Sequence, residues 1–144
     1  MVKHLSLFWL ALAAVIFADQ FVKQLILDGF RWQSECISIV FTLNKGVAFS
    51  MFAFLGPYLK YLQVGLIIFA ASFVLVQGYL RGYAVPLGIL FGAGISNVYD
   101  RFVHGGVVDY VSWHCGFDFA IFNLADVLID LAIVLILYIH FRKN

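Results

Sequence analysis

The strongest constraint on the fold is the presence of four long apolar segments in a chain of only 144 residues. They cover about 5–27, 58–78, 84–103 and 119–141. At a rise of 1.5 Å per residue, a helix of about 20 residues crosses the hydrocarbon of a bilayer. Only 12% of the residues are charged, whereas a soluble domain carries about a quarter. The sequence therefore predicts a mainly α membrane protein, with four transmembrane helices in one membrane domain, 1–144.

Charged residues at the ends of these segments indicate the orientation of the chain. The basic residues on one side of the expected bilayer are Lys3, Arg81, Arg142 and Lys143. Because cytoplasmic loops are enriched in Lys and Arg, this side is expected to be cytoplasmic and to hold both termini. The outer side carries both signs, namely Asp28, Arg31, Glu35, Lys45, Lys60 and Asp118. The net charge of +1 does not suggest nucleic-acid binding.

The outer connection at about 28–56 is expected to form a small extracytoplasmic β-platform. Large apolar residues occupy every second position of 37–44, which is the period of a half-buried strand. Asn44-Lys45-Gly46 predicts a turn, after which 47–52 is expected to return as a second strand. The side chains expected to face the lipid are Phe49, Met51, Phe52 and Phe54. The second outer connection, 104–118, is expected to be short.

Small residues recur every four positions in the third apolar segment, at Gly88, Gly92 and Ser96. This spacing lets helix backbones approach closely in lipid. We therefore expect this helix face to serve packing and to carry no chemistry.

Ionisable residues inside the apolar segments each need a partner or a chemical role, because each costs roughly 2.5–3.5 kcal/mol to insert. Asp19 and Lys23 lie four residues apart, which indicates either an internal ion pair or a direct chemical role. Near the outer end of the third segment, one helix face carries Asn97, Asp100 and Arg101. Arg101 can form a bidentate bond to a carboxylate, which would be a structural role. One face of the fourth segment carries Asn123, Asp126 and Asp130.

Other residue types give little indication of catalysis. No serine is paired with a histidine and a lysine as a nucleophile would be, and no His-Glu-x-x-His sequence is present. Cys36 and Cys115 lack metal-ligand spacing. Both lie on the outer side, where a disulfide is chemically permitted, but two free thiols are expected. Paired aspartates remain, since two close carboxyls share one proton and act as general base and general acid. Composition alone does not select the pair.

A small transporter or scaffold with a proton relay is an alternative reading of the same residues. Ionisable groups of a relay are distributed through the membrane depth. Here the carboxylates gather at one membrane face, and the second apolar segment has none. This asymmetry favours catalysis at the membrane surface.

Five short motifs, in order along nearly the whole chain, resemble those of lipoprotein signal peptidase (signal peptidase II), an intramembrane aspartic peptidase family. They are Asp19-Gln20-x-x-Lys23, Asn44-x-Gly46-x-Ala48-Phe49-Ser50, Asn97-x-x-Asp100-Arg101, Gly106-x-Val108-Asp109-Tyr110 and Phe122-Asn123-x-Ala125-Asp126. Each motif alone is weak evidence, but their joint order on a chain with four apolar segments is specific.

The resemblance implies that Asp109 and Asp126 form a catalytic dyad that works without a metal or other cofactor. The residues implied to support the dyad or bind substrate are Asp19, Lys23, Asn44, Asn97, Arg101 and Asn123. The implied substrate is a diacylglyceryl-modified prolipoprotein, cleaved before its lipidated cysteine. Membrane phospholipids are the other expected partners, and a monomer is expected. The implied location is the bacterial inner membrane, with the active site near the outer face.

Two positions depart from the family pattern. Ser96 stands where the family often has glycine, and modest repacking is expected there. Asp130 belongs to no matched motif and lies one turn deeper than Asp126. Pairing with a polar neighbour is the favoured role for Asp130, and raising the proton affinity of the dyad is the alternative.

Overall fold

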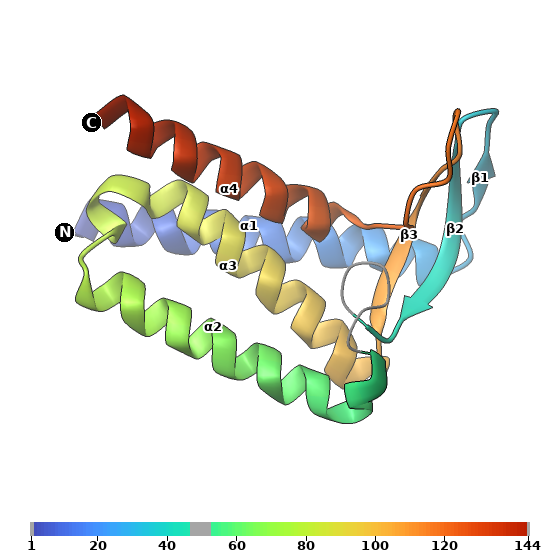
Figure 1. Cartoon of the computed structure of the whole chain (residues 1–144), viewed down its shortest axis with the longest axis horizontal. Coiled ribbons are helices and arrows are strands. Elements are labelled where there is room, and N and C mark those ends of the chain that lie inside the picture. Colours follow the sequence, from blue (N-terminus) through green and yellow to red (C-terminus); the bar gives the residue numbers. More distant parts are fainter. Residues whose placement is uncertain (1, 47–52, 144) are drawn as a thin grey trace.

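Four long helices carry a small sheet across one end of the bundle, while both termini lie at the other end (Figure 1). The computed structural model describes residues 2–46 and 53–143. The elements, in order, are α1 (Val2–Leu27), β1 (Trp32–Gln33), β2 (Ile37–Asn44), the short 3₁₀ helix η2 (Ala53–Tyr58), α2 (Leu59–Val76), α3 (Leu80–Val103), β3 (Val107–Trp113) and α4 (Leu124–Lys143). The prediction of a mainly α-helical fold with a small sheet is confirmed.

The helix α3 occupies the centre of the bundle and packs against α1, α2 and α4. In the described part of the chain, three helical stretches are long and apolar enough to cross a membrane: Val2–Leu27, Phe54–Val76 and Leu124–Lys143. The α3 sequence is less apolar, because it carries glycines and polar side chains toward its neighbours. Large apolar side chains on the outer faces of the other helices are exposed, as a lipid-facing surface requires.

The packing prediction for the third segment is confirmed at Gly88 and Gly92. A Cβ atom added at Gly88 would lie 2.5 Å from the Phe8 carbonyl oxygen, and one at Gly92 would lie 2.7 Å from the Leu12 carbonyl oxygen. Real Cβ atoms do not approach oxygen so closely, so glycine is required where α1 and α3 meet. Their backbone contact sets the relative position of the two helices.

The helix α4 begins at Leu124, although its apolar sequence extends back to Phe119. Phe122 instead continues the sheet through an isolated antiparallel bridge to Val111. The helix begins here because Asn123 is its N-cap residue, whose side-chain oxygen accepts the Asp126 backbone N–H. The chain therefore enters α4 directly from the sheet.

The sheet has the strand order β1-β2-β3, with both neighbouring pairs antiparallel. The strand expected at 37–44 is confirmed as β2. The second outer connection, which was expected only to be short, contains a strand that was not predicted, since Val107–Trp113 forms β3. Its first four residues are all buried, so the apolar-polar alternation of a half-buried strand is absent. The strand expected at 47–52 lies outside the described residues, as do Phe49, Met51 and Phe52; Phe54 is exposed.

The expectation of two free thiols is wrong, because Cys36 and Cys115 form a disulfide with an S–S distance of 2.01 Å. The register of β2 and β3 pairs Ile37 with Trp113, and the His114 backbone N–H donates to the Cys36 carbonyl at 2.9 Å. Cys36 directly precedes Ile37, and Cys115 lies two residues after Trp113. The disulfide therefore connects β2 and β3 at the end of the sheet farthest from Asn44.

Gly92→Ala tests the close contact of α1 and α3, with Gly94→Ala as its matched control. An added Cβ at Gly94 meets only the Ile67 side chain, at an ordinary 3.8 Å. We expect Gly92→Ala to lower stability by about 1–3 kcal/mol, the usual cost of overpacking, and Gly94→Ala to be neutral. Thermal unfolding of the detergent-solubilised variants measures this. Equal midpoints for the two variants would contradict the packing argument.

Candidate active site

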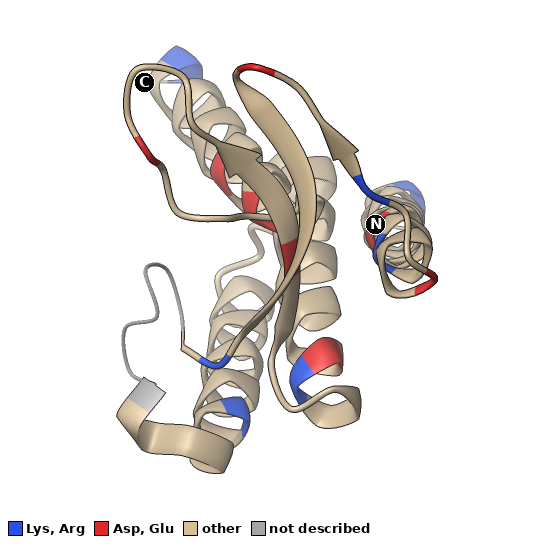
Figure 2. Cartoon of the chain, turned by 90° about the vertical axis from the view of Figure 1, so that its right-hand side faces the viewer, with Lys and Arg blue, Asp and Glu red and all other residues tan. Residues whose placement is uncertain are grey.

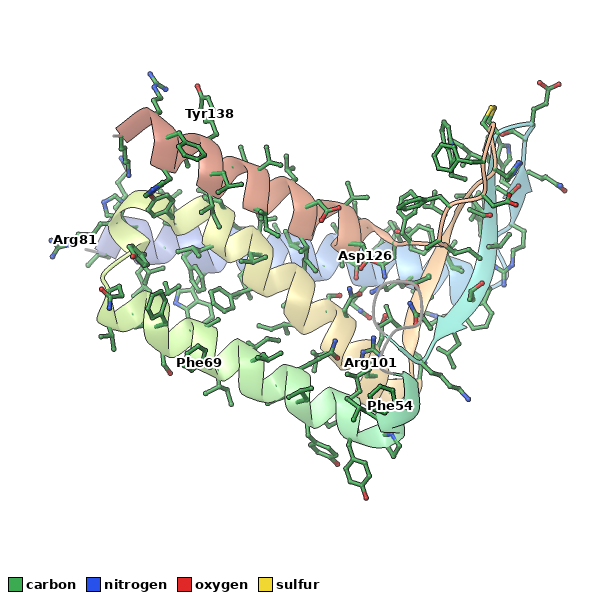
Figure 3. The ribbon with its side chains drawn as sticks, viewed as in Figure 1. Phe54, Phe69, Arg81, Arg101, Asp126 and Tyr138 are labelled. Atoms are coloured by element: carbon green, nitrogen blue, oxygen red, sulfur yellow. A yellow bond between two sulfur atoms is a disulfide. The ribbon has the colours of Figure 1, made fainter. Side chains whose placement is uncertain are left out.

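A cavity of about 610 Å³ lies where the bundle meets the sheet, and both Asp109 and Asp126 line it. Its other polar lining residues are Asn44, Gln63, Asn97, Arg101 and Asp130. Its apolar lining residues are Val107, Phe119, Ala120, Ile121, Phe122, Val127 and Ile129. Figure 3 shows Asp126 and Arg101 at this end of the bundle. The fold thus brings two carboxyl groups into one largely apolar cavity.

Asp126 is positioned by the N-terminus of its own helix. The Asn123 side-chain Oδ1 accepts the Asp126 backbone N–H at 2.9 Å, and Asp126 Oδ2 accepts the Asn123 backbone N–H at 3.0 Å. This is a reciprocal capping box with aspartate as its third residue, and the positive end of the helix dipole favours a carboxylate there. The same carboxyl therefore caps α4 and faces the cavity.

The remaining N–H groups in the first turn of α4 are satisfied by other elements. The Leu124 backbone N–H donates to the Tyr110 hydroxyl at 3.0 Å, and the Ala125 backbone N–H donates to Asp19 Oδ1 at 2.9 Å. The first turn is thus attached to both β3 and α1. Burial raises the pKa of the Tyr110 phenol to about 12, so this hydroxyl stays protonated.

Asp109 lies on β3 and is 2% exposed. Its Oδ2 accepts a hydrogen bond from Asn44 Nδ2 at 2.9 Å, and its Oδ1 accepts one from Asn123 Nδ2 at 2.7 Å. Burial raises the pKa of the Asp109 carboxyl to about 6, and the charge of Asp126 adds to this effect. The two amide hydrogen bonds oppose the rise. Asp109 is therefore able to exchange a proton near neutral pH.

Two asparagine amides connect the aspartates. Asn97 Nδ2 donates to Asp126 Oδ1 at 3.0 Å, while Asn123 Nδ2 reaches both Asp109 and, at 3.2 Å, Asn97 Oδ1. Among the described residues, no hydrogen bond joins Asp109 directly to Asp126. The carboxyls thus face one cavity while neutral amide donors hold both of them.

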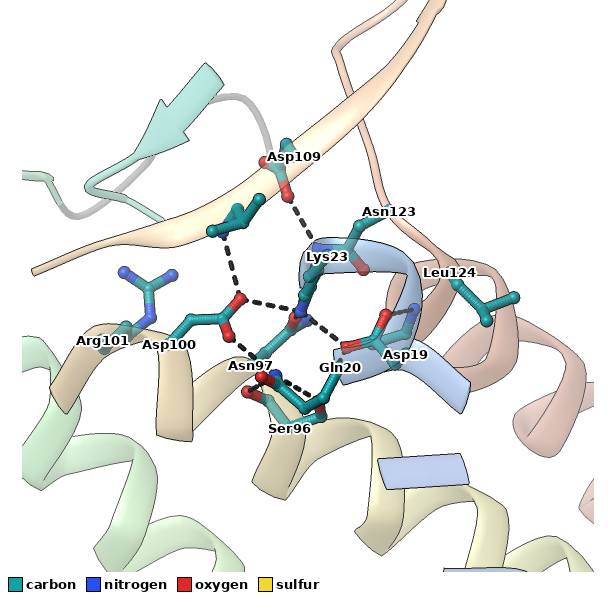
Figure 4. A network of polar contacts seen from close by, with 12 residues as sticks. Asp19, Gln20, Lys23, Ser96, Asn97, Asp100, Arg101, Asp109, Asn123 and Leu124 are labelled. Atoms are coloured by element: carbon teal, nitrogen blue, oxygen red, sulfur yellow. Dashed lines mark hydrogen bonds and ion pairs between the residues drawn. The ribbon is translucent and has the colours of Figure 1, made fainter. Parts of the chain in front are cut away.

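Lys23 is the centre of a buried network below the dyad (Figure 4). Its ammonium lies 2.6 Å from Asp19 Oδ2 and 2.8 Å from Asp100 Oδ2, and it donates to Asn97 Oδ1 at 2.9 Å. The internal ion pair of Asp19 and Lys23 is confirmed. The sequence places Asp100 on one helix face with Asn97 and Arg101 but indicates no partner for it. In the structure, Asp100 also accepts the Val108 backbone N–H at 3.1 Å. It therefore connects α3 to β3.

Ser96 and Gln20 belong to the same network, and neither was predicted as a site residue. Ser96 Oγ donates to Asp19 Oδ2 at 2.6 Å, so this position adds a polar contact to the packing face. Gln20 Nε2 donates to Ser96 Oγ and to Asp100 Oδ1, both at 2.8 Å. Two features of the sequence could have indicated these roles. Gln20 belongs to a matched motif, and Ser96 carries a hydroxyl where the family often has glycine.

Arg101 contacts backbone carbonyls, and it forms no ion pair with a carboxylate among the described residues. Its guanidinium donates to the Gly46 carbonyl and, at 3.5 Å, to the Asn44 carbonyl. These contacts fasten the end of β2 to α3. Since Asn44 in turn donates to Asp109, Arg101 supports the dyad through the backbone. Its Nε is buried and has no partner among the described residues.

Asp130 lines the cavity and is exposed. The expected polar partner is absent among residues 2–46 and 53–143. The carboxyl therefore faces the cavity and makes no structural pair in the described part of the chain.

The described residues contain no group of three or more His, Cys, Asp or Glu side chains arranged to hold a metal ion. The site instead offers aspartate carboxyls, neutral amide donors and a cavity of about 610 Å³ with mostly apolar walls. Such a pair can activate water with one carboxylate while the other carboxyl donates a proton.

Comparisons with known proteins agree with the site. Residues 11–142 match the sequence profile of a family described as signal peptidase (SPase) II. A lipoprotein signal peptidase of Sulfurimonas denitrificans is 51% identical over 143 residues, covering 99% of this chain and 93% of the relative. One of Wolinella succinogenes is 55% identical over 140 residues, covering 94% of each.

The fold is also similar to solved structures of bacterial membrane enzymes. Two of them have TM-scores of 0.78 and 0.77 at sequence identities of 24% and 22%. The first similarity covers 93% of this chain and 87% of the solved chain, and the second covers 94% and 92%.

Asp109→Asn tests the buried state of the Asp109 carboxyl. Because its pKa is near 6 in the folded protein and near 3.8 in the unfolded chain, the native state binds the proton more tightly. Wild-type stability should therefore fall as pH rises from about 4 to about 6, by up to about 3 kcal/mol. The Asn variant lacks this titration. Its thermal midpoint, relative to that of the wild type, should therefore increase as the pH rises from about 4 to about 6. A difference independent of pH would contradict the assignment.

Proposed function

This chain belongs to the signal peptidase II family, and we propose that Asp109 and Asp126 are its catalytic dyad. The protein is a membrane peptidase that removes signal peptides from prolipoproteins. We further propose that it acts on diacylglyceryl-modified precursors and cleaves before the lipidated cysteine. The observation that carries the dyad is the presence of both carboxyls in one cavity, linked through Asn123. Family membership argues against the alternative of a proton-relay transporter.

The dyad works through one shared proton. The ionised carboxylate takes a proton from a water molecule, whose oxygen attacks the carbonyl carbon of the scissile bond. The protonated carboxyl donates to the carbonyl oxygen, giving a tetrahedral intermediate. When this intermediate collapses, the C–N bond breaks and the leaving nitrogen receives the proton that the first carboxyl took from water. The second carboxylate takes back a proton from an intermediate hydroxyl, which leaves a carboxylic acid product and restores the shared proton. Neutral amides of Asn44, Asn97 and Asn123 hold the carboxyls in place throughout.

The other site residues are assigned supporting roles. Lys23 and Asp19 fix the network below the dyad, and Arg101 fixes Asn44. The cavity has mostly apolar walls and a volume of about 610 Å³, which suits an apolar peptide segment carrying acyl chains.

We propose four membrane passes, with both termini in the cytoplasm and the dyad near the outer face of the inner membrane. Both termini lie opposite the sheet, and acidic positions gather behind the strands when the molecule is viewed from the sheet end (Figures 1 and 2). The disulfide supports placing the sheet outside, because disulfides persist in oxidising compartments. Basic residues near the termini support the same orientation.

Asp109→Asn and Asp126→Asn test the dyad. Asparagine has nearly the same shape as aspartate but acts neither as a general base nor as an acid. Each variant should therefore lose cleavage of a lipidated precursor peptide in detergent by much more than tenfold, which is only ~1.4 kcal/mol of barrier. Substantial cleavage by either variant, at normal abundance, would end the assignment.

Asp130→Asn is the matched control on the same helix and in the same cavity. We expect it to keep most of the activity, because Asp130 contacts no dyad residue in the described structure. Abundance and thermal stability are measured for all three variants, since removing a buried carboxyl can destabilise a fold by itself. An inactive but stable Asp130→Asn protein would show that the reacting centre extends one turn deeper.

Reporter fusions test the topology. A reporter placed after Asn144 and one inserted near Glu35, beside the outer strands, should report opposite compartments. The C-terminal reporter is expected to be cytoplasmic. The same compartment at both positions would rule out four passes.

A further inference from the structure

A second cavity, of about 320 Å³, lies beside the active-site cavity and is lined by three basic side chains. These are Lys45, after β2, Lys60, in the first turn of α2, and Arg101, near the end of α3. The other described lining residues are Gly56, Pro57, Leu59 and Gly105, so no acidic side chain among the described residues lines this cavity. Arg101 lines both cavities.

None of the three cations is neutralised by an ion pair in the described part of the chain, where both salt bridges belong to Lys23. The Lys60 ammonium lies 4.7 Å from the ring centre of Phe102 and 5.5 Å from that of Tyr61. The Arg101 Nε is buried without a partner among the described residues. A buried donor left unsatisfied costs stability, so an acceptor from outside the chain would be favourable.

The aromatic residues around this cavity indicate its depth in the membrane. Exposed rings near its rim belong to Phe54, Tyr58, Tyr61 and Phe102, at the start of α2 and the end of α3. Figure 3 shows Phe54 and Arg101 at the same end of the bundle. Tyr and other large aromatic residues gather at the level of the lipid headgroups. The three cations therefore lie where headgroup phosphates are found, on the face where Lys and Arg are normally scarce.

We propose that this cavity binds the headgroup phosphate of an anionic phospholipid in the outer leaflet. Lysine ammonium groups act as point charges for phosphate, and an arginine N–H provides a directional donor. An anionic lipid is favoured over a zwitterionic one because three positive charges line the cavity and no acidic side chain there would receive a cationic headgroup. The substrate attributed to the enzyme carries diacylglyceryl without phosphate, so this site is distinct from the site of cleavage.

Binding at this cavity reaches the dyad through Arg101. The guanidinium that would contact the phosphate also holds the carbonyls of Asn44 and Gly46, and the Asn44 side chain donates to Asp109. An anionic lipid should therefore raise kcat for precursor peptide and leave KM nearly unchanged. This consequence rests on the proposed function, whereas lipid binding itself does not.

Thermal unfolding of the full-length protein in a non-ionic detergent tests the binding. Phosphatidylglycerol and phosphatidylcholine with the same acyl chains are titrated in parallel, with inorganic phosphate as a third arm. We expect phosphatidylglycerol to raise the midpoint more than phosphatidylcholine, and phosphate alone to give no shift. Lys45→Gln combined with Lys60→Gln should weaken the apparent affinity for phosphatidylglycerol by about fivefold per lysine.

Arg31→Gln is the matched control, because Arg31 is an exposed cation on the same membrane face and does not line the cavity. It should keep the affinity for phosphatidylglycerol, as should the combination of Lys45→Arg and Lys60→Arg, which retains both charges. An unchanged affinity in the double Gln variant, or an equal loss in Arg31→Gln, would overturn the proposal.

The remaining outcomes also decide the question. A full shift with inorganic phosphate would overturn the lipid assignment in favour of a soluble anion site, and a full shift with a soluble acidic peptide would favour a peptide partner. If the double Gln variant fails to fold, the double Arg variant decides, since loss of lipid selectivity there contradicts the proposal. These binding measurements need no turnover, so their failure is distinct from failure of the proposed peptidase activity.

Discussion

The buried ammonium of Lys23 is the interaction on which the site depends. It is 1% exposed and lies within 2.8 Å of carboxylates from both α1 and α3, those of Asp19 and Asp100. Both acidic partners also bind backbone N–H groups, Asp19 at the start of α4 and Asp100 at the start of β3. Loss of this cation would leave two buried carboxylates unneutralised, at a cost of several kcal/mol. One charge thus holds together the helices and the strand that carry the dyad.

The same ammonium sets the direction of the hydrogen bonds around the dyad. Since Lys23 only donates, the Asn97 oxygen must face it, and the Asn97 amide nitrogen is left for Asp126. The Asn123 oxygen accepts a helix N–H, which leaves its amide nitrogen for Asp109. Both carboxyls therefore accept hydrogen bonds from side-chain amides, and these amide donors are uncharged. Arg101 completes the arrangement from the other side by fixing the backbone at Asn44.

The parts of the fold that follow from local patterns could be predicted from the sequence. Four apolar segments gave long helices, alternation over 37–44 gave β2, and the glycine spacing gave the contact of α1 with α3. The strand β3 could not be predicted, because a strand buried on both faces lacks alternation. The disulfide and the polar role of Ser96 depend on tertiary register, which pairs residues 79 and 77 positions apart. Motif resemblance brought together the eight expected site residues, but it did not indicate that Arg101 binds carbonyls instead of a carboxylate.

The neutral character of the donors supports the proposal that two aspartates share one proton in this cavity. Lys23 directly contacts Asp19 and Asp100, and Arg101 directly contacts backbone carbonyls. Neither cation forms an ion pair with Asp109 or Asp126 among the described residues. A direct ion pair would favour full ionisation of a carboxyl and remove the proton that the general acid must donate. Amide donors stabilise a carboxylate less strongly, so the second negative charge remains unfavourable in a cavity with apolar walls. Lys23 is linked to Asp126 only through the side-chain amide of Asn97. It therefore orients the proposed dyad without neutralising its charge.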